Sequence, residues 1–376
     1  MPHHTTPHHT TSLSPIRIAH LHRWISHDIE SLASALRIKD TKLLGRLVLD
    51  DKNPDFIIFS EWCMTTIDKC NLLKHYLRHN RHSVFIFMTG ECIEPDLNIF
   101  DYAIIFNRDL MCGDRIAHNL PCLYKRLIDD TIKNDLTSEQ ACQCLTSGLR
   151  FCNFIYSHAN EPRDTYFYML SKYKQVDSLG GWLNNTNTNS TRYASNYYEH
   201  SIQMKSRYKF SLAMENASCK GYTTEKIVSS LQAHTVPIYW GDPAVTDYIN
   251  PKAFINCHDY SSFDEVIERV KEIDNNDELW LDMVTQPWQT EEQYARTLHE
   301  MEDYTRFTEN ILSQDVRSAK RRTEGLWSNN YRKCFTGMVG IMPPLYLRAF
   351  RKLRHIIGML LSDKTKTAIK HFLHMD

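Results

Sequence analysis

The chain has 376 residues, of which 42% are hydrophobic and 24% are charged, the balance of a globular protein with an apolar core. Its formal net charge of −1 excludes the overall basic field that nucleic-acid binding requires, so no nucleic acid is expected as a partner. No run of about 18 apolar residues predicts a membrane span, and 11 scattered cysteines without a C-x-x-C pair favour a reducing, cytoplasmic setting.

The first 14 residues contain two copies of Pro-His-His-Thr-Thr. They lack the charged and then apolar pattern of a secretory signal. We expect residues 1–14 to be a disordered His/Thr-rich leader, because metal capture by its four histidines would need a fold to hold them.

The first third of the chain alternates short apolar runs with helical segments. Apolar runs without polar alternation are typical of parallel strands that are buried on both faces. Strands that alternate with helices predict an α/β layer around a parallel sheet. The predicted strands are 16–21, 56–59, 84–88 and 102–106, and the predicted helices are 26–36 and 68–79.

Glu91 stands just after the third of these strands. Gly90 permits a tight backbone exit, and the end of a parallel strand points toward the edge where α/β sheets bind ligands. A carboxylate in that place suits a general base, although a loop carboxylate in water is the ordinary alternative.

A polar, partly helical stretch at residues 124–150 is the predicted connection between two domains. A second alternation follows it, with strands at 151–156, 208–214, 236–240 and 254–257 and helices at 163–174, 225–234 and 263–273. The sequence therefore predicts two Rossmann-like domains, residues 15–145 and 150–330, which face a cleft that is the expected ligand site.

Arg163 follows the strand at 151–156 and opens the next helix. A guanidinium group in that position can bind a phosphate through two parallel N–H groups. The ordinary alternative is a surface arginine on a first helical turn.

The segment 208–226 carries the strongest chemical signal. Its apolar strand ends in Glu-Asn, and a polar tip then leads through Gly-Tyr-Thr-Thr-Glu-Lys into a helix. Thr223 is the predicted N-cap, and the free N–H groups at the helix start attract anions. Lys226 adds a positive charge in the first turn, so the arrangement suits a diphosphate.

The side chains around that helix start complete a candidate nucleotide-sugar site. Glu225 and Asn216 are candidates for binding ribose hydroxyls, and Tyr222 is a candidate for contact with the sugar or base. An ordinary capped strand–turn–helix explains the same pattern without a ligand.

The last part of the chain, residues 331–376, changes in composition. Residues 345–361 place apolar side chains near one helical face, and arginines flank them. A basic amphipathic helix of this kind can lie on an anionic membrane surface, so contact through residues 345–376 is predicted. A helix docked on the protein with a basic outer face is the alternative.

The segment 208–226 resembles the donor-binding signature of the α-1,3/4-fucosyltransferase family, glycosyltransferase family 10. That signature reads roughly Y-K-F-x-L-x-F-E-N-S and then Y-x-T-E-K. The resemblance continues through 234–243 and 250–260, covers about residues 83–300, and looks closest to the bacterial, Helicobacter-type branch.

The resemblance implies a GT-B architecture, with the donor nucleotide held by the C-terminal domain. It implies inverting transfer of L-fucose from GDP-fucose to the N-acetylglucosamine of N-acetyllactosamine-type glycans, as in Lewis-antigen-like lipopolysaccharide chains. With the tail, it implies a cytoplasmic enzyme that is peripheral on the inner face of the cytoplasmic membrane.

The resemblance also implies roles for single residues. Asn216, Tyr222, Glu225 and Lys226 fall on donor-binding positions of the family, and Arg163 falls on an arginine that precedes a matching L-S-K-Y-K segment. Glu91 lies in an element that matches the family's T-G-E-N, which holds the family's catalytic base. Cys92 stands where the family often has Asn.

These residues together imply a single displacement without a covalent nucleophile. Arg163, Lys226 and the helix start would stabilise the negative charge on departing GDP, and Glu91 would take the acceptor proton. The chain has no D-x-D element for a divalent ion on the diphosphate, so neither a metal nor a cofactor is expected.

Three alternatives stay open. The linkage formed can be α-1,4 or a mixture of 1,3 and 1,4, and the donor can be another nucleotide sugar used by a GT-B enzyme. The third alternative is a non-catalytic nucleotide- or glycan-binding protein, which would keep Lys226 and have no need of Glu91.

Overall fold

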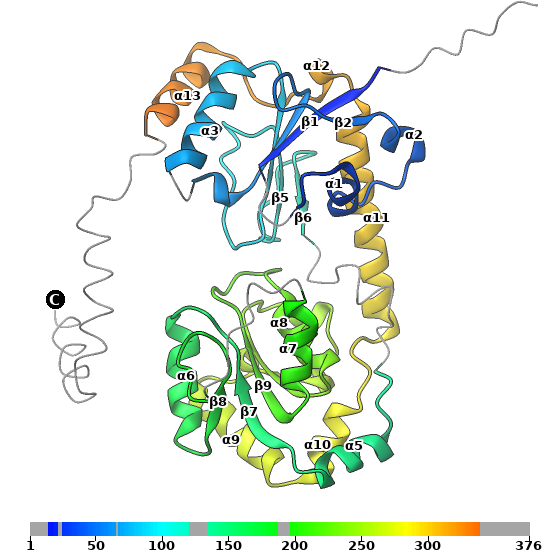
Figure 1. Cartoon of the computed structure of the whole chain (residues 1–376), viewed down its shortest axis with the longest axis vertical. Coiled ribbons are helices and arrows are strands. Elements are labelled where there is room, and N and C mark those ends of the chain that lie inside the picture. The colour runs from blue at the N-terminus through cyan, green and yellow to red at the C-terminus, as the bar shows by residue number, and fades with distance from the viewer. Residues whose placement is uncertain (1–13, 22–24, 65–66, 120–133, 187–195, 339–376) are drawn as a thin grey trace, which may run out of the picture. The chain divides into compact units, whose positions relative to one another are not determined.

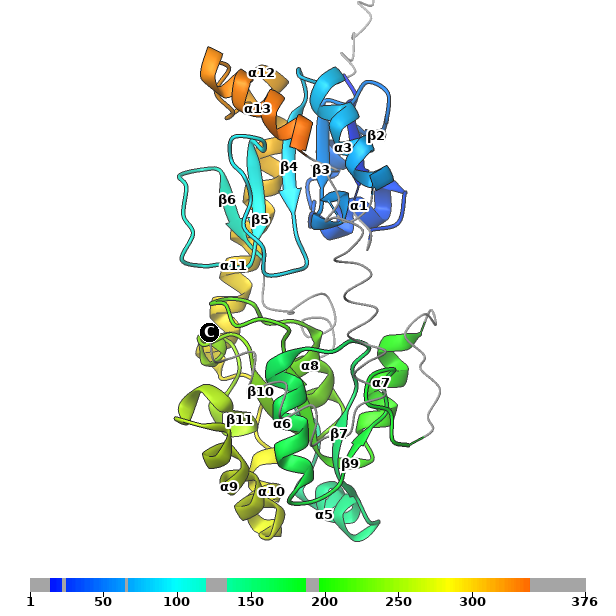
Figure 2. The same cartoon turned by 90° about the vertical axis from the view of Figure 1, so that its left-hand side faces the viewer.

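The computed structural model describes residues 14–21, 25–64, 67–119, 134–186 and 196–338. They contain two β-sheets, each accompanied by helices (Figure 1; Figure 2). The strand order is β2-β1-β3-β4-β5-β6 in the first sheet and β11-β10-β9-β7-β8 in the second, and the pairings within each are parallel. The predicted α/β class with two Rossmann-like domains is confirmed.

The first sheet holds all four strands that the sequence predicts in the first third, and two short strands in addition. Its strands are β1 (Ile16–Leu21), β2 (Leu47–Leu49), β3 (Phe56–Phe59), β4 (Val84–Met88), β5 (Tyr102–Ile105) and β6 (Ile116–His118). Leu21 pairs with Phe59, and Phe59 pairs with Phe87, so β1, β3 and β4 reach the same edge of the sheet. The chain that leaves β4 toward Glu91 starts from that edge.

One face of the first sheet is covered by helices from both ends of the chain. These are α1 (Ile29–Ala35), α2 (Thr41–Leu44), α11 (Glu291–Ser313) and α12 (Val316–Ala319). Tyr304, Ile311 and Leu312 of α11 share a core with Ile18 and Ile58. Part of the segment that the sequence placed in the second domain, 150–330, therefore packs in the first, because α11 carries an apolar stripe that the first sheet buries.

The second sheet follows the predicted alternation closely. Its strands are β7 (Arg150–Phe154), β8 (Val176–Ser178), β9 (Tyr208–Met214), β10 (Val236–Trp240) and β11 (Ile255–Asn256). Its helices are α5 (Ser138–Thr146), α6 (Glu161–Ser171), α7 (Tyr197–Lys205), α8 (Glu225–Gln232), α9 (Phe263–Asp274) and α10 (Asp277–Val284).

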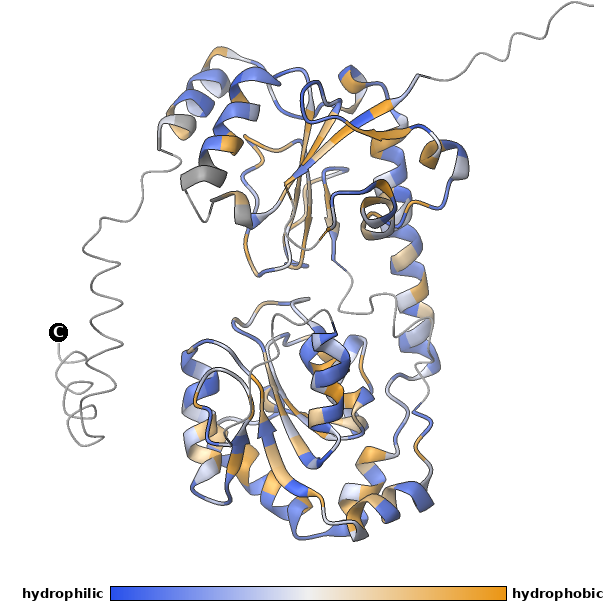
Figure 3. Ribbon diagram, viewed as in Figure 1, coloured by the Kyte–Doolittle hydropathy of each residue, from blue (hydrophilic) through white to orange (hydrophobic). Residues whose placement is uncertain are grey.

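The side chains of the central strands alternate between two cores. Leu212 and Met214 pack in the core that includes α6, α9 and α10, whereas Ala213 packs in the core that includes α8. These strands are buried on both faces and are largely apolar, which Figure 3 shows as orange along much of their length, although β9 also buries Lys209 and Ser211. Helix α6 begins at Glu161, two residues before the predicted start, because Asn160 is its N-cap and Pro162 fits the first turn.

Two helices belong to a separate compact unit, which within the described residues comprises 62–64, 67–81 and 323–338. They are α3 (Ile67–His79), close to the predicted 68–79, and α13 (Leu326–Met338). The predicted leader, up to residue 13, and the amphipathic segment 345–376 lie outside the described residues. In the part of the chain that is described, no helix combines the length and the apolar character that a membrane crossing needs.

Candidate active site

Glu91 stands where the sequence places it, three residues after the end of β4. Thr89 shapes the turn, since its hydroxyl accepts a hydrogen bond from the Glu91 N–H (3.0 Å) and lies 3.1 Å from the Glu91 carbonyl oxygen. The Asn119 side-chain amide in turn donates to the Thr89 carbonyl (2.6 Å). The backbone of Glu91 is thus fixed to the first sheet while its side chain is exposed.

The carboxylate of Glu91 contacts two of the predicted donor residues. Its Oε2 accepts hydrogen bonds from the Tyr222 hydroxyl (2.8 Å) and from Nδ2 of Asn216 (2.7 Å). Within the described residues no hydrogen bond reaches Oε1. The loop that follows β4 in the first sheet and the loop that follows β9 in the second therefore meet at one carboxylate.

Tyr222 acts as the hydrogen-bond donor in that contact. Burial, together with the charges of Glu215 and Glu91, raises the pKa of Tyr222, so its phenol stays protonated at neutral pH. Its ring is 1% exposed and packs edge-on against Phe106 from the first sheet, with 4.9 Å between ring centroids. Tyr222 is therefore held firmly in the orientation that serves Glu91.

Asp242 shapes the loop before Tyr222. Its buried carboxylate accepts hydrogen bonds from the Gly221 N–H (2.8 Å) and the Thr223 hydroxyl (2.9 Å). Gly221 has φ +93°, a conformation that side chains disfavour. A Cβ atom there would meet the Phe106 carbonyl oxygen at 2.4 Å, so only glycine lets the loop lie this close to the first sheet.

We expect Gly221→Ala to lower the free energy of unfolding by about 1–3 kcal/mol, because it combines a strained φ with a clash against backbone. Urea unfolding measures the change. Gly90→Ala is the matched control, since a Cβ at Gly90 meets nothing within 4 Å. Equal stability of the two variants would contradict the expectation.

Lys226 lies in the first turn of α8, as predicted, but it is already paired. Its Nζ is 2.8 Å from the buried Glu215 Oε2 and 3.4 Å from Glu225 Oε1. Burial works against the charged form, yet these two carboxylates raise the pKa of Lys226 well above its usual range, so it is a permanent cation.

The predicted N-cap is wrong by one residue. Helix α8 begins at Glu225 with Thr224 as its N-cap, and the Thr224 hydroxyl hydrogen-bonds to Glu215 (2.7 Å) instead of capping the helix. The Thr224 hydroxyl bonds to Glu215 because this carboxylate is fully buried, and a buried carboxylate needs hydrogen-bond donors. Thr224 consequently gives α8 no side-chain cap, and the Glu225 carboxylate hydrogen-bonds to its own backbone N–H. A helix start without an N-cap side chain suits an anion site.

Glu225 is half-buried beside Lys226. Burial raises its pKa, but the Lys226 charge outweighs this effect, and the pKa of Glu225 lies below its usual range. Glu225 is therefore an ionised acceptor at neutral pH, as the binding of ribose hydroxyls requires.

Arg163 is buried, with 7% exposure, in the first turn of α6. Its guanidinium carbon lies 4.3 Å from the centroid of the Tyr156 ring, and its Nε has no hydrogen-bond partner among the residues described. Burial raises the pKa of Tyr156 to about 12, although the positive charges of Arg163 and Lys226 act to lower it. Both predicted cations therefore lie near the same tyrosine.

Sequence reasoning missed the two buried carboxylates that organise the site, Glu215 and Asp242. Both stand in motifs that the sequence shows, Glu-Asn after β9 and Gly-Asp-Pro after β10, and a charged residue within two positions of the end of a buried strand is the signal for them.

Cys92, which replaces the family's asparagine, does not hold the Glu91 carboxylate. The Glu91 side chain is held by Tyr222 and Asn216, and the Cys92 thiol lies instead beside the Cys219 thiol. Burial first, and then Cys92, raises the pKa of Cys219 to about 12, so Cys219 stays a thiol.

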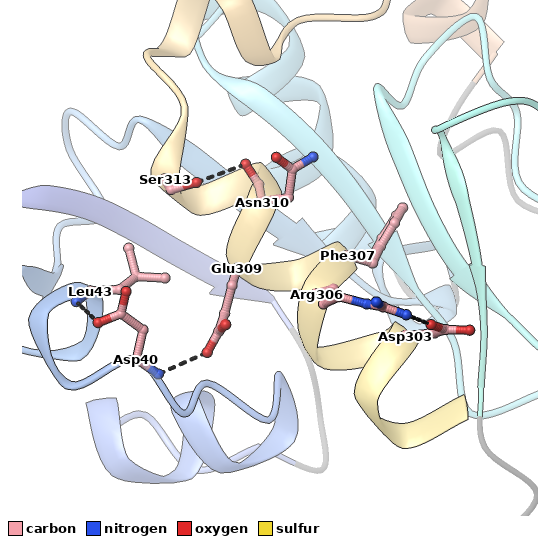
Figure 4. Close-up of a pocket in the computed structure, with 8 residues that line it drawn as sticks. All are labelled: Asp40, Leu43, Asp303, Arg306, Phe307, Glu309, Asn310 and Ser313. Atoms are coloured by element: carbon pink, nitrogen blue, oxygen red, sulfur yellow. Dashed lines mark hydrogen bonds and ion pairs between the residues drawn. The ribbon is translucent and has the colours of Figure 1, made fainter. Parts of the chain in front are cut away.

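Two further features bear on ligand binding outside this site. Among residues in the described ranges, no three or more His, Cys, Asp or Glu side chains group as metal ligands would. A surface pocket between α2 and α11 is lined by residues such as Asp40, Phe307 and Glu309 (Figure 4), and none of the predicted site residues lines it.

Comparisons with known proteins agree with this reading of the second sheet. Residues 150–324 match the sequence pattern of the C-terminal part of glycosyltransferase family 10 (fucosyltransferase). A putative fucosyltransferase of Acanthamoeba polyphaga mimivirus is 38% identical over 206 residues, which are 54% of this chain and 33% of that protein. An alpha-(1,3)-fucosyltransferase of Helicobacter pylori is 31% identical over 229 residues, 53% of this chain and 46% of that protein.

The matched regions thus span less than half of either relative. A crystal structure of an alpha1,3-fucosyltransferase with GDP-fucose superposes with a TM-score of 0.59 and 24% identity, over 83% of this chain and 94% of that one. This likeness shows the two-domain GT-B fold. Residues 150–324 are therefore similar to the C-terminal part of glycosyltransferase family 10, the fucosyltransferases.

Proposed function

We propose that the chain is an inverting α-1,3-fucosyltransferase. It moves L-fucose from GDP-fucose to the N-acetylglucosamine of N-acetyllactosamine-type glycans, such as the Lewis-like chains of lipopolysaccharide. The proposal rests on the hydrogen bonds that Tyr222 and Asn216 donate to Glu91. These bonds place a candidate base against the region that matches family 10.

Glu91 is the proposed general base. An acceptor hydroxyl hydrogen-bonded to Oε1 would give its proton to Glu91 as its oxygen bonds to the anomeric carbon of fucose. The bond from that carbon to the GDP oxygen breaks in the same displacement, so the anomeric configuration inverts. The Tyr222 and Asn216 donors orient the carboxylate for this step.

The second domain supplies the positive charge that the leaving group needs. Arg163, Lys226 and the uncapped start of α8 face the negative charge that develops on departing GDP. Glu225 and Asn216 are the proposed partners of the ribose hydroxyls. We propose that these cations take the role that a divalent metal has in other nucleotide-sugar enzymes.

The test is GDP release from GDP-fucose, with N-acetyllactosamine present and EDTA added. The proposal expects turnover that depends on the acceptor and survives EDTA. Release that needs no acceptor, or that stops with EDTA and returns with Mg²⁺, would contradict it.

Competition binding separates the remaining alternatives. GDP should displace a bound guanine nucleotide far better than UDP does, whereas the reverse order would favour another nucleotide-sugar donor. Tight GDP binding without turnover on any glycan would favour a non-catalytic binding protein.

We propose in addition that residues 345–376 hold the protein on the inner face of the cytoplasmic membrane. The support is the basic amphipathic sequence pattern alone. We expect deletion of residues 345–376 to abolish co-sedimentation with anionic liposomes and to leave transfer activity unchanged. Undiminished co-sedimentation of the shortened protein would refute this proposal.

A further inference from the structure

Lys205, the last residue of α7, is a buried lysine that contacts the first two turns of α8, where the proposed donor site lies. It is 6% exposed, and its Nζ lies 2.6 Å from Ser229 Oγ, 3.2 Å from Ser230 Oγ and 3.4 Å from the Lys226 carbonyl oxygen. It makes no ion pair with a carboxylate in the part of the chain described. Its partners are therefore neutral oxygens, all on the first two turns of α8.

The oxygens around Lys205 form one network with the first turn of α8. The Lys226 carbonyl oxygen also accepts from Ser229 Oγ (3.2 Å) and Ser230 Oγ (2.8 Å). Ser230 Oγ lies 3.1 Å from the Ser211 hydroxyl on β9. A change at Lys205 is thereby transmitted to the backbone of Lys226, whose side chain is a proposed phosphate ligand.

The charged groups that face Lys205 come from α8 and from the end of β9. Burial lowers the pKa of Lys205 to about 7, Glu225 and Glu215 act to raise it, and the Lys226 charge acts to lower it further. At neutral pH the ammonium and the amine are consequently both populated, which is unusual for a lysine.

We propose that Lys205 is a positioning residue of the donor site, and that its amine takes up a proton when the diphosphate of GDP-fucose binds beside Lys226 and Glu225. The inference rests on the proposed function, because it assumes that the anionic donor binds at the start of α8. Two negative charges brought near a partly neutral amine favour its ammonium form. By linkage, donor affinity falls as the pH rises above neutrality.

The experiment is calorimetric titration of GDP-fucose into the full-length protein at pH 7, in two buffers of different ionisation heat. Both phosphates of GDP-fucose are esterified, so the ligand itself does not titrate near pH 7. The expected result is net proton uptake by the protein on binding, since burial lowers the pKa of Lys205 to about 7 and so leaves neutral amine that the bound diphosphate favours protonating. Lys205→Met should bind without proton uptake, and its affinity should not change between pH 6.5 and 8.5.

Lys209→Met is the matched control. Lys209 is also a buried lysine of the second domain, but it is paired with Asp274 and Asp277, so its loss should leave the proton uptake intact. If Lys205→Met does not fold, Ser229→Ala replaces it. Removing the shortest bond to the ammonium should move the maximum of proton uptake to lower pH.

The outcomes separate this inference from the proposed function. Failure of the wild-type protein to bind GDP-fucose would overturn the proposed function. Binding without proton uptake, or equal uptake by the wild type and Lys205→Met, would overturn the role of Lys205 and leave the donor site standing.

Discussion

Glu91→Gln is expected to lower the turnover rate of fucosyl transfer by roughly 100- to 10,000-fold, because this is the usual contribution of a general base to the rate. The glutamine keeps the size of the side chain, and its amide oxygen can still accept from Tyr222 and Asn216, so the geometry survives. What is lost is the ability to take the acceptor proton. Donor binding should therefore stay within about twofold of the wild type.

Initial rates of GDP release measure the first effect, and titration with GDP measures the second. Glu94→Gln is the control for the loop. Glu94 is an exposed carboxylate three residues further on that accepts a hydrogen bond from Asn107, and it should retain nearly full activity. If Glu91→Gln turned over within about threefold of the wild type, another group would have to be the base.

Lys226→Met has the second largest expected effect, and it acts on the donor. Loss of a charge-assisted contact worth about 1.5–3 kcal/mol should raise the KM for GDP-fucose roughly 10- to 150-fold. The turnover rate should fall as well, because the charge on departing GDP also loses its partner. Lys220→Met, on the same loop but exposed and paired with Asp109, should change neither value by more than about twofold.

The same substitution should change how stability depends on pH. Glu215 is 0% exposed, and burial already raises its pKa although Lys226 opposes this effect. Without Lys226, the pKa of Glu215 should rise further, so the folded state binds a proton that the unfolded state releases above about pH 4.3. Stability of the variant should then fall as the pH rises through the gap between these two pKa values. Thermal unfolding from pH 5 to 8 measures this loss, and a wild-type pH profile in Lys226→Met would contradict it.

Long strands were predictable from the sequence because they are buried on both faces. The apolar runs at 208–214 and 236–240 have the same limits as β9 and β10. The short strands β2, β6 and β8 were not predicted. They contain three residues each. β8 consists of Val, Asp and Ser, and its Asp177 is accommodated by the Tyr208 hydroxyl, 31 residues further on, in a contact that the sequence does not reveal.

The residues of the candidate site could be predicted where a sequence motif identifies them. They could not be predicted where only the fold brings them together. Glu91 and Tyr222 could be named from strand ends and from the family resemblance, but their contact depends on how close two loops 131 residues apart in sequence come. Helix α11 was not assigned to the first core, since its apolar stripe does not say which sheet will bury it. Lys205 looks like an ordinary lysine at a helix end until Ser229 and Ser230 are found around it.

The most direct test of the account is the structure of the product, determined by NMR after incubation with GDP-fucose and N-acetyllactosamine. A single new fucose, α-linked to O3 of N-acetylglucosamine, is expected, because one displacement assisted by Glu91 inverts the β-linked donor. A β-linked fucose would contradict the single displacement. The absence of any fucosylated product, with an active donor and an intact protein, would contradict the proposed transfer itself.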